Sequence, residues 1–356
     1  MKRILITNAG GSPSTNFVRS LRQAPERFYL IGVDCDKYYL QRAETDEKYL
    51  IPAMGDKNYF KILNEIIKKT KAYFLHIQNS AEIEFLSDKL DKIKIKTFLP
   101  NKETITICQN KFKAYKKWED NKLPQPRTLF LNNKEDLKKA FKKLGGKIWV
   151  REIKGSGGKG SLPTEDFKQA KTWIDFKNGW GKFTAAEYLS PQSITWQSIW
   201  KKGELIVAQT RKRLYWEFAK ISPSEVSGAT GAAITVSDPI VDDIALRSIY
   251  AIDKKPHGIF SVDMTYDKNN IPNPTEINIG RFFTTHEFFT QAGLNMPYIF
   301  IKLAFNEPYS EPIREINPLS KNLVWIRGMD FLPILTTLKK IEKYEKEFNE
   351  RKNKKR

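Results

Sequence analysis

The sequence is poor in cysteine and has no long hydrophobic run. Its two cysteines, Cys35 and Cys108, lie far apart and form no CxxC pair, so the sequence supports neither a disulfide framework nor a thiolate zinc site. Met1 leads directly into a short strand pattern, and no later segment approaches the roughly 20 apolar residues of a membrane helix. We therefore expect a cytoplasmic protein with no membrane partner.

Acidic residues are outnumbered by basic ones. The chain has 41 Asp and Glu against 61 Lys and Arg, which gives a formal net charge of +20 over 356 residues. This excess favours anionic partners such as nucleotides, carboxylated metabolites or nucleic acid. Much of it is lysine spaced along helical segments such as 61–71 and 135–144, which is more typical of solvated faces than of a nucleic-acid surface. Nucleic acid therefore stays open as a partner but is not favoured.

The complete signatures of several enzyme classes are missing. Gly10-Gly11-Ser12 follows the first strand but does not match the dinucleotide fingerprint GxGxxG, and Gly158-Lys159-Gly160 is not the GK[ST] of a Walker loop. No HRD or DFG sequence of a protein kinase and no nucleophile elbow of a serine hydrolase is present. His286 begins HEFF, which lacks the second histidine of a zinc motif. These classes are therefore unsupported.

The chain reads as several structural units. Strand and helix patterns alternate over 1–110, which is typical of an α/β domain with a parallel sheet. A helix from residue 111 stops before Pro124 and Pro126, which indicates a boundary near 120–127. Residues 193–200, 203–210 and 211–216 look like three strands of a meander, 221–238 like a loop, and 282–305 like one helix. A charged helix and basic tail occupy 336–356.

The segment Phe260–Arg281 carries the most informative pattern. Polar and apolar residues alternate over 260–267, which predicts a strand with one buried face. A polar turn around Asn269-Asn270 then leads to a second strand that would place Glu276 roughly across from Asp263, with Asn278 beside them. Three such oxygen donors suit Mg²⁺, with Arg281 close behind. The alternative is an ordinary solvated acidic face.

A second pattern is the glycine-rich segment 154–161, KGSGGKGS. Gly155, Gly157 and Gly160 satisfy GxGxxG, but Leu162-Pro163 intervene before the next helix, unlike in a dinucleotide-binding unit. Because glycine has no side chain, the backbone N–H groups of such a segment can approach phosphates closely, and the flanking lysines add positive charge. We interpret the segment as a phosphate cover rather than as a plain mobile linker.

In order and spacing, three elements together resemble the ATP-grasp superfamily, and in particular one unit of the carbamoyl-phosphate synthase large subunit. They are GKIWVREIKGSGGKGS, then AAEYLSPQSITWQ, and then IFSVDMTYD with PTEINIGR. The resemblance covers roughly 1–290. It implies a mixed α/β and α+β fold, with a Rossmann-like pre-ATP-grasp domain at 1–110 and an ATP-grasp domain at 111–335 whose lid subdomain spans about 127–190.

The resemblance also implies roles for individual residues. Asp263, Glu276 and Asn278 would hold one or two Mg²⁺ ions, or Mn²⁺ in their place, against the β- and γ-phosphates of ATP. Arg151 and Arg281 would act in catalysis.

The nucleotide would be held by residues from the linker helix, the strand before the glycine loop, the loop itself and the hinge. These are Lys111, Arg151, Lys154, Gly157, Gly158, Gly160, Glu187, Tyr188 and Leu189. The acid that the family places on the ribose has no counterpart, because Pro191-Gln192-Ser193 stands there. The usual Asn-x-Arg ending is here Asn278-Ile279-Gly280-Arg281.

We therefore expect an ATP- and Mg²⁺-dependent ligase that joins a small carboxylate to an amine, or to a thiol, through an acylphosphate with release of ADP and phosphate. Arg213, Arg281 and His286 are placed where an anionic acceptor could bind. A full carbamoyl-phosphate synthase needs two such units, so that activity is not expected. The alternative is a nucleotide- or RNA-binding protein with this fold and little turnover. The sequence leaves open a homodimer and the identity of both substrates.

Overall fold

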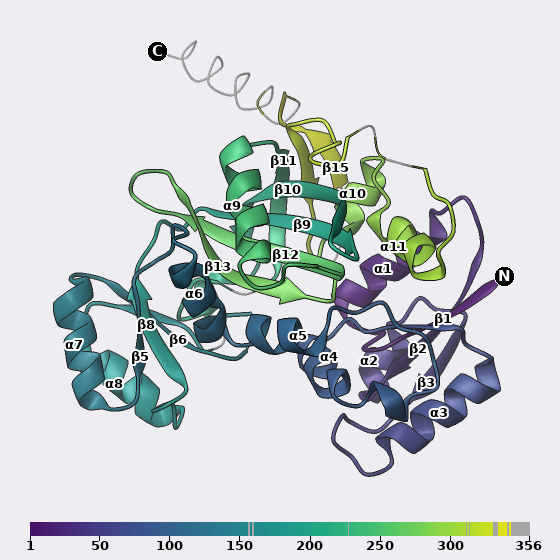
Figure 1. Cartoon of the computed structure of the whole chain (residues 1–356), viewed down its shortest axis with the longest axis horizontal. Helices are drawn as coiled ribbons and strands as arrows, with labels where there is room; N and C mark the ends of the chain where they lie inside the picture. Colours follow the sequence, from purple (N-terminus) through teal and green to yellow (C-terminus); the bar gives the residue numbers. More distant parts are fainter. Residues whose placement is uncertain are drawn as a thin grey trace, which may run out of the picture.

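The computed structural model describes residues 1–329 except 156, 159, 227, 311 and 313, together with 334–339 and 342. Three sheets organise the chain (Figure 1). The predicted charged helix and tail at 336–356 lie mostly outside the described residues, and 336–337 belong to a strand instead. No helix in the described part of the chain is long and apolar enough to cross a membrane.

The first sheet is parallel, with the strand order β3-β2-β1-β4. Its elements alternate along the chain as the sequence predicts for an α/β unit. They are β1 (Lys2–Ile6), α1 (Ser12–Arg22), β2 (Phe28–Asp34), α2 (Lys37–Gln41), β3 (Glu47–Leu50), α3 (Tyr59–Thr70), β4 (Phe74–His76), α4 (Ser80–Ser87), a 3₁₀ turn at Leu90–Lys92, and α5 (Lys102–Cys108).

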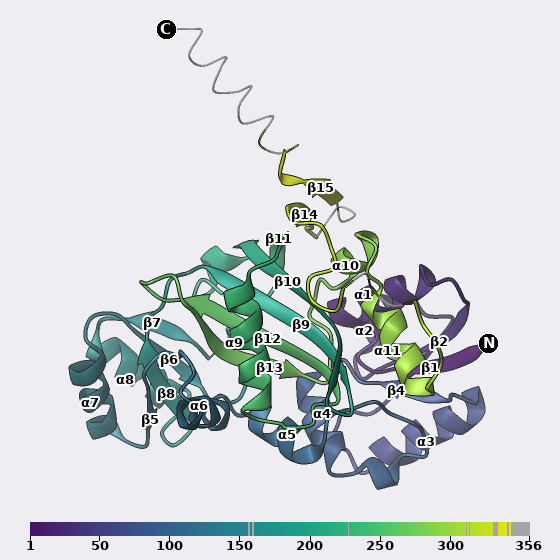
Figure 2. The same cartoon turned by 45° about the horizontal axis from the view of Figure 1, so that its top comes forward.

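The second sheet has four antiparallel strands in the order β5-β8-β6-β7 and its own small core under two helices. Helix α6 leads into it, and Figure 2 shows this unit beside the largest sheet. The elements are α6 (Lys111–Asp120), β5 (Thr128–Leu131), α7 (Lys134–Leu144), β6 (Ile148–Glu152), β7 (Leu162–Thr164), α8 (Phe167–Phe176) and β8 (Phe183–Glu187).

The largest sheet has the order β13-β12-β9-β10-β11-β14-β15. Its elements are β9 (Ser193–Lys201), β10 (Glu204–Trp216), a 3₁₀ turn at Ala219–Ile221, β11 (Thr230–Val236), α9 (Pro239–Tyr250), β12 (Gly258–Tyr266), β13 (Pro272–Ile279), α10 (Glu287–Gln291), α11 (Met296–Phe305), β14 (Leu323–Ile326) and β15 (Ile334–Thr337). The mixed parallel and antiparallel architecture confirms the expected fold class.

Three predicted boundaries were wrong. Residues 204–216 form one strand rather than two, because the pairing with β9 continues through it and a bulge near Leu205 absorbs an extra residue. The predicted loop at 221–238 contains β11, whose small residues fit between flanking strands; a side chain at Gly231 would collide with the Tyr215 ring. The predicted helix at 282–305 is two helices, separated at Gly293, which has φ of +104°.

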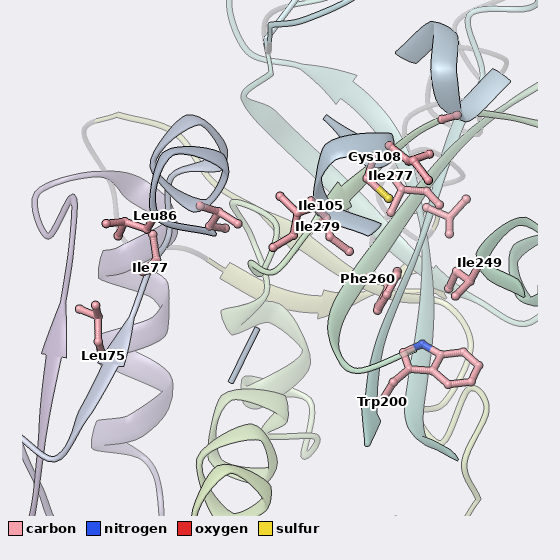
Figure 3. Close-up of a cluster of buried hydrophobic side chains, with 14 of the residues drawn as sticks. Leu75, Ile77, Leu86, Ile105, Cys108, Trp200, Ile249, Phe260, Ile277 and Ile279 are labelled. Atoms are coloured by element: carbon pink, nitrogen blue, oxygen red, sulfur yellow. The ribbon is translucent and has the colours of Figure 1, made fainter. Parts of the chain in front are cut away.

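The two faces of the largest sheet are covered differently. One face packs on α9 and α5, in an apolar cluster that includes Phe260 and Ile277 and extends through α4 to Leu75 of β4 (Figure 3). The other face contributes Ile199 and Ile259 to a second cluster with α1, α10 and α11. Further along that second face the strands carry polar side chains, because alternate residues of a strand point to the same side. This polar half-face, between the largest sheet and the second sheet, contains the candidate site.

Candidate active site

The site is built on the antiparallel pair β12 and β13. Asp263 lies directly opposite Glu276, and Ser261 lies opposite Asn278, as the hairpin pattern predicts. Directly paired residues of adjacent strands point to the same face. Asn278 donates from Nδ2 to Asp263 Oδ2 over 2.9 Å. Two carboxylates and one side-chain amide therefore gather on one surface.

A bulge shapes the edge of this pair. The register shifts between Asp263 and Met264, which leaves Thr275 as the additional residue on β13. Bulges bend a strand and redirect its groups. The Thr275 carbonyl accepts a hydrogen bond of 2.8 Å from Arg151 Nη2, and its hydroxyl donates to the Asp263 carbonyl over 3.1 Å. The bulge therefore connects β6 of the second sheet to the carboxylate pair.

Asp263 is largely shielded from solvent, and its neighbours favour the carboxylate form. Thr195 Oγ1 and Arg213 Nη2 donate to its Oδ1, the arginine over 2.8 Å. Burial alone raises the pKa of Asp263, but the charge of Arg213 and these hydrogen bonds outweigh it and hold the pKa below its usual range. The site therefore presents a carboxylate anion inside the protein.

Two cations approach from the second unit. Lys111, at the start of α6, donates from Nζ to the Gly155 carbonyl over 2.6 Å and lies 3.4 Å from Glu276 Oε2. Burial lowers the pKa of Lys111, while Glu276 opposes that shift. Burial also lowers the pKa of Arg151, whose Nε has no hydrogen-bond partner among the described residues. An unpaired buried donor is costly, so Arg151 is suited to an anionic ligand.

Arg281 closes the far end of the site. Its Nη2 donates to Asn278 Oδ1 over 2.5 Å and its Nε to Ser80 Oγ of α4 over 2.6 Å. Gly280, with φ of +73°, directly follows the last residue of β13 and precedes Arg281. Burial lowers the pKa of Arg281, with Glu276 and Asp263 opposing that shift. The arginine therefore reaches the triplet despite the extra residue before it.

The glycine loop lies against the segment before β11. Gly157 and Gly158 have φ of +69° and +70°, a region that favours glycine. A Cβ on Gly158 would lie 2.4 Å from the Val226 carbonyl, while Ser224 Oγ donates to the Gly158 carbonyl over 3.3 Å. This close approach requires glycine at position 158. A loop that covers a ligand from this position would therefore need glycine there.

The predicted hinge residues Glu187, Tyr188 and Leu189 lie at the end of β8. The Glu187 carboxylate accepts from the Arg127 backbone N–H over 2.8 Å and from its Nε over 2.6 Å, at the end of β8. Tyr188 is exposed, with Lys147 Nζ 4.5 Å from the centre of its ring, and Leu189 is half-buried. These residues follow β8 and precede β9, which carries Thr195.

Three further predicted residues make contacts within the protein itself. Lys154 pairs with Glu84 of α4 over 2.7 Å. Gly160 is fixed by the Trp173 indole, which donates to its carbonyl over 3.3 Å. His286 is fully buried, with Nδ1 2.8 Å from the Phe283 carbonyl and its ring beside Phe282. Burial lowers its pKa to about 4, so His286 is a packed residue.

Sequence reasoning missed two residues of this surface. Thr195 holds Asp263, and Arg211 lies directly opposite Thr195 on β10. The available signal was the alternation of β9 and β10, which puts Thr195, Gln197, Gln209, Arg211 and Arg213 on the face of Asp263. A separate pocket of about 300 Å³ lies around Lys212 and Tyr266. It contains none of the site residues, because its β10 residue points to the opposite face.

Comparisons with known proteins found similar structures but no similar sequences. Neither protein-family models nor curated protein sequences match this sequence. The structure resembles the biotin carboxylase domain of the 2-oxoglutarate carboxylase from Hydrogenobacter thermophilus, solved with MgADP, ADP and bicarbonate. The TM-score is 0.71 at 14% identity, over 92% of this chain and 74% of that one.

Two further structures are similar. N5-carboxyaminoimidazole synthetase from Staphylococcus aureus with ADP has a TM-score of 0.69 at 15% identity, over 98% of this chain and 86% of that one. An L-amino acid ligase from Bacillus licheniformis has a TM-score of 0.67 at 11% identity, over 91% and 79%. At these identities the likeness concerns the fold. The expected ATP-grasp fold is therefore confirmed.

Proposed function

We propose that this protein is an ATP- and Mg²⁺-dependent ligase that joins a small carboxylate to an amine, or to a thiol, and releases ADP and phosphate. One observation carries the proposal: Asp263 and Glu276 face each other on adjacent strands, while Lys111 and Arg151 reach the same place from the second unit. Such an arrangement suits a nucleoside triphosphate with its metal, because the carboxylates can hold the metal and the cations can hold the phosphates. The three neighbours named above have related activities, which supports a ligase in general terms.

The residues present fit a magnesium ion. Asp263 is held as an anion, and Glu276 adds a second carboxylate on the same face. The Asn278 amide oxygen accepts from Arg281 in this structure, so it would exchange that partner for the ion. These hard oxygen donors are the ligands that Mg²⁺ takes together with water and substrate phosphates. When bound, the ion would neutralise charge on the phosphates during transfer. Mn²⁺ prefers the same kind of ligand.

The nucleotide would be held by backbone and cationic groups. Lys111 and Arg151 would take phosphate oxygens, since both are largely shielded from solvent and Arg151 has an unpaired Nε. Gly157 and Gly158 would lie over the phosphates, where a larger residue would strain the backbone and collide with the facing segment. Glu187, Tyr188 and Leu189 would contact the adenine, and Glu187 would then exchange part of its bond with Arg127.

The chemistry would proceed by carboxylate activation. An oxygen of the substrate carboxylate would attack the γ-phosphorus of ATP, and the bond to the β–γ bridging oxygen would break to give an acylphosphate and ADP. The amine or thiol would then attack the acyl carbon, lose its proton and expel phosphate. This transfer depends mainly on positioning and on neutralising the phosphate charge, which Arg151 and Arg281 can supply. Closure of the glycine loop would exclude water from the acylphosphate.

The test is a product screen with purified protein. We would incubate it with Mg²⁺ and ATP across pools of carboxylates, amines and thiols, and measure ADP with phosphate against AMP with pyrophosphate. The proposal expects ADP and phosphate with a particular pair, and a loss of about 100-fold or more in Glu276→Gln. Glu204→Gln, at the distant start of β10, is the matched control. AMP formation, or equal rates in both variants, would contradict the proposal.

A further inference from the structure

Arg211 is a buried cation with unmet hydrogen-bonding capacity. Its side chain lies on β10 and is 1% exposed. Its Nε and Nη1 have no hydrogen-bond partner in the described residues. An unpaired buried donor is costly, and buried charges are normally paired. Arg211 therefore destabilises the folded protein when no ligand is bound. A ligand that accepts hydrogen bonds from these donors would offset that cost.

Arg211 belongs to the same surface as the carboxylate triplet. It lies opposite Thr195 of β9, and Thr195 lies opposite Asp263 of β12. Two strand spacings, about 10 Å, therefore separate the backbones of Arg211 and Asp263. The guanidinium carbon lies 4.2 Å from the centre of the Phe283 ring, which supports it from one side.

Two other arginines surround the same place. Arg213, two residues along β10, points to the same face and is already paired with Asp263 over 2.8 Å. Arg327 follows β14 and donates from Nη1 to the Thr284 carbonyl over 3.2 Å. Burial first, and then the like charges of Arg213 and Arg327, lower the pKa of Arg211. The facing acids are Asp263, which is paired with Arg213, and Glu217, which attracts Arg327. Positive charge therefore predominates.

The position of this arginine cluster relative to Asp263 distinguishes it from the nucleotide side. Lys111 and Arg151 approach from the β13 edge, beside Glu276. Arg211 lies on the other side of Asp263, in the strand order β13-β12-β9-β10. Two cationic groups thus flank one acidic centre. In a phosphoryl transfer, the donor phosphates and the acceptor anion need separate partners on opposite sides of the transferred group.

We propose that Arg211, with Arg213 and Arg327, forms the subsite that binds the carboxylate or phosphate group of the acceptor substrate. The assignment of the bound group to the acceptor substrate rests on the proposed ligase function, whereas the presence of an anion subsite does not. The subsite selects an anionic substrate, since a neutral one would leave the Arg211 donors unpaired in the interior.

The test uses the full chain without nucleotide. We would titrate it with inorganic phosphate and, separately, with succinate, and measure the melting temperature against potassium chloride at equal ionic strength. We expect a saturable rise in wild type that is lost in Arg211→Met and kept in Arg247→Met, an exposed arginine on α9. The stronger of the two probes identifies the group. An equal, saturable rise in Arg211→Met would overturn the proposal.

Two further readouts separate the possible causes. Without any probe, Arg211→Met should melt higher than wild type, because an unpaired buried cation has been removed. Hydrogen exchange of wild-type β10 should slow with the preferred probe but not with chloride. Absence of slowing would overturn the proposal even if the variant does not fold.

MgADP binding distinguishes this subsite from the ligase function. Arg211→Met should bind MgADP within about threefold of wild type, because Arg211 lies away from the nucleotide side. If neither protein binds MgADP but the probe effect still needs Arg211, the ligase function fails and the subsite stands. If MgADP binds to both and the probe effect ignores Arg211, the subsite alone fails.

Discussion

Arg213 Nη2 lies 2.8 Å from Asp263 Oδ1, with side chains that are 9% and 13% exposed. This ion pair joins the proposed anion subsite to the proposed metal site. A guanidinium that neutralises Asp263 competes with a divalent cation for the same carboxylate. The pair therefore makes the two sites interdependent.

The first prediction follows from that competition. Arg213→Met should bind Mn²⁺ about tenfold more tightly in the absence of nucleotide, because a hydrogen bond to a charged group is worth about 1.5–3 kcal/mol. Its rate of ADP formation should nevertheless fall. Paramagnetic detection of free Mn²⁺ measures the affinity. Weaker Mn²⁺ binding would show that Arg213 supports the metal site instead.

The second prediction concerns Arg151. Arg151→Met should reduce ADP formation about 100-fold, because it removes a buried donor that we propose binds the phosphates. Arg151→Lys should recover part of that loss, since it keeps the charge but loses the planar fork. Steady-state kinetics with ATP as the varied substrate measures both. As a control, Arg247→Lys should leave the rate unchanged, and an unaltered rate in Arg151→Met would remove Arg151 from the site.

Much of this site was predictable from local pattern. Alternation over 260–267 and the polar turn after it fixed which side chains of the hairpin share a face, so the pairing of Asp263 with Glu276 followed. The contacts of Arg281 were not predictable, because Ser80 lies 201 residues earlier in the chain. The same applies to Arg211: alternation places it on the right face, but its unpaired nitrogens depend on the tertiary packing that sets it against Phe283. Its guanidinium is therefore visible as a candidate site only in the folded protein.

The third prediction concerns Glu82, buried in the first unit. Tyr59 OH donates to Glu82 Oε1 over 2.6 Å, and Thr7 donates to the other oxygen. Burial raises the pKa of Glu82 in the folded state. Its stabilising contribution is therefore complete below the unfolded pKa near 4.5 and is lost as pH rises through the folded value.

Glu82→Gln should accordingly raise the melting temperature more at pH 8 than at pH 5. Thermal unfolding at both values measures the difference. Glu84→Gln, on the exposed side of α4, is the control and should show no such pH dependence beyond its surface pair with Lys154. A larger gain at pH 5 would mean that Glu82 is anionic in the fold.

The fourth prediction concerns His76, which stacks on Phe17 with ring centroids 3.8 Å apart. Burial lowers the pKa of His76 to about 3, with a small opposing effect from Gln78. The unfolded chain therefore binds an additional proton below about pH 6.5. Stability should fall as pH decreases from 6.5, by up to about 1.4 kcal/mol per pH unit for this group. His76→Gln should flatten that slope in urea unfolding between pH 4.5 and 6.5, and an unchanged slope would contradict the assignment.

The central claim is that Asp263, Glu276 and Asn278 bind a divalent cation together with a nucleotide. The most direct measurement is ADP affinity by calorimetry, with and without Mg²⁺, in wild type, Glu276→Gln and the control Glu204→Gln. We predict that wild type and the control bind ADP at least about tenfold more tightly with Mg²⁺, and that Glu276→Gln loses this gain. ADP binding that ignores both Mg²⁺ and Glu276, or no ADP binding at all, would contradict the claim.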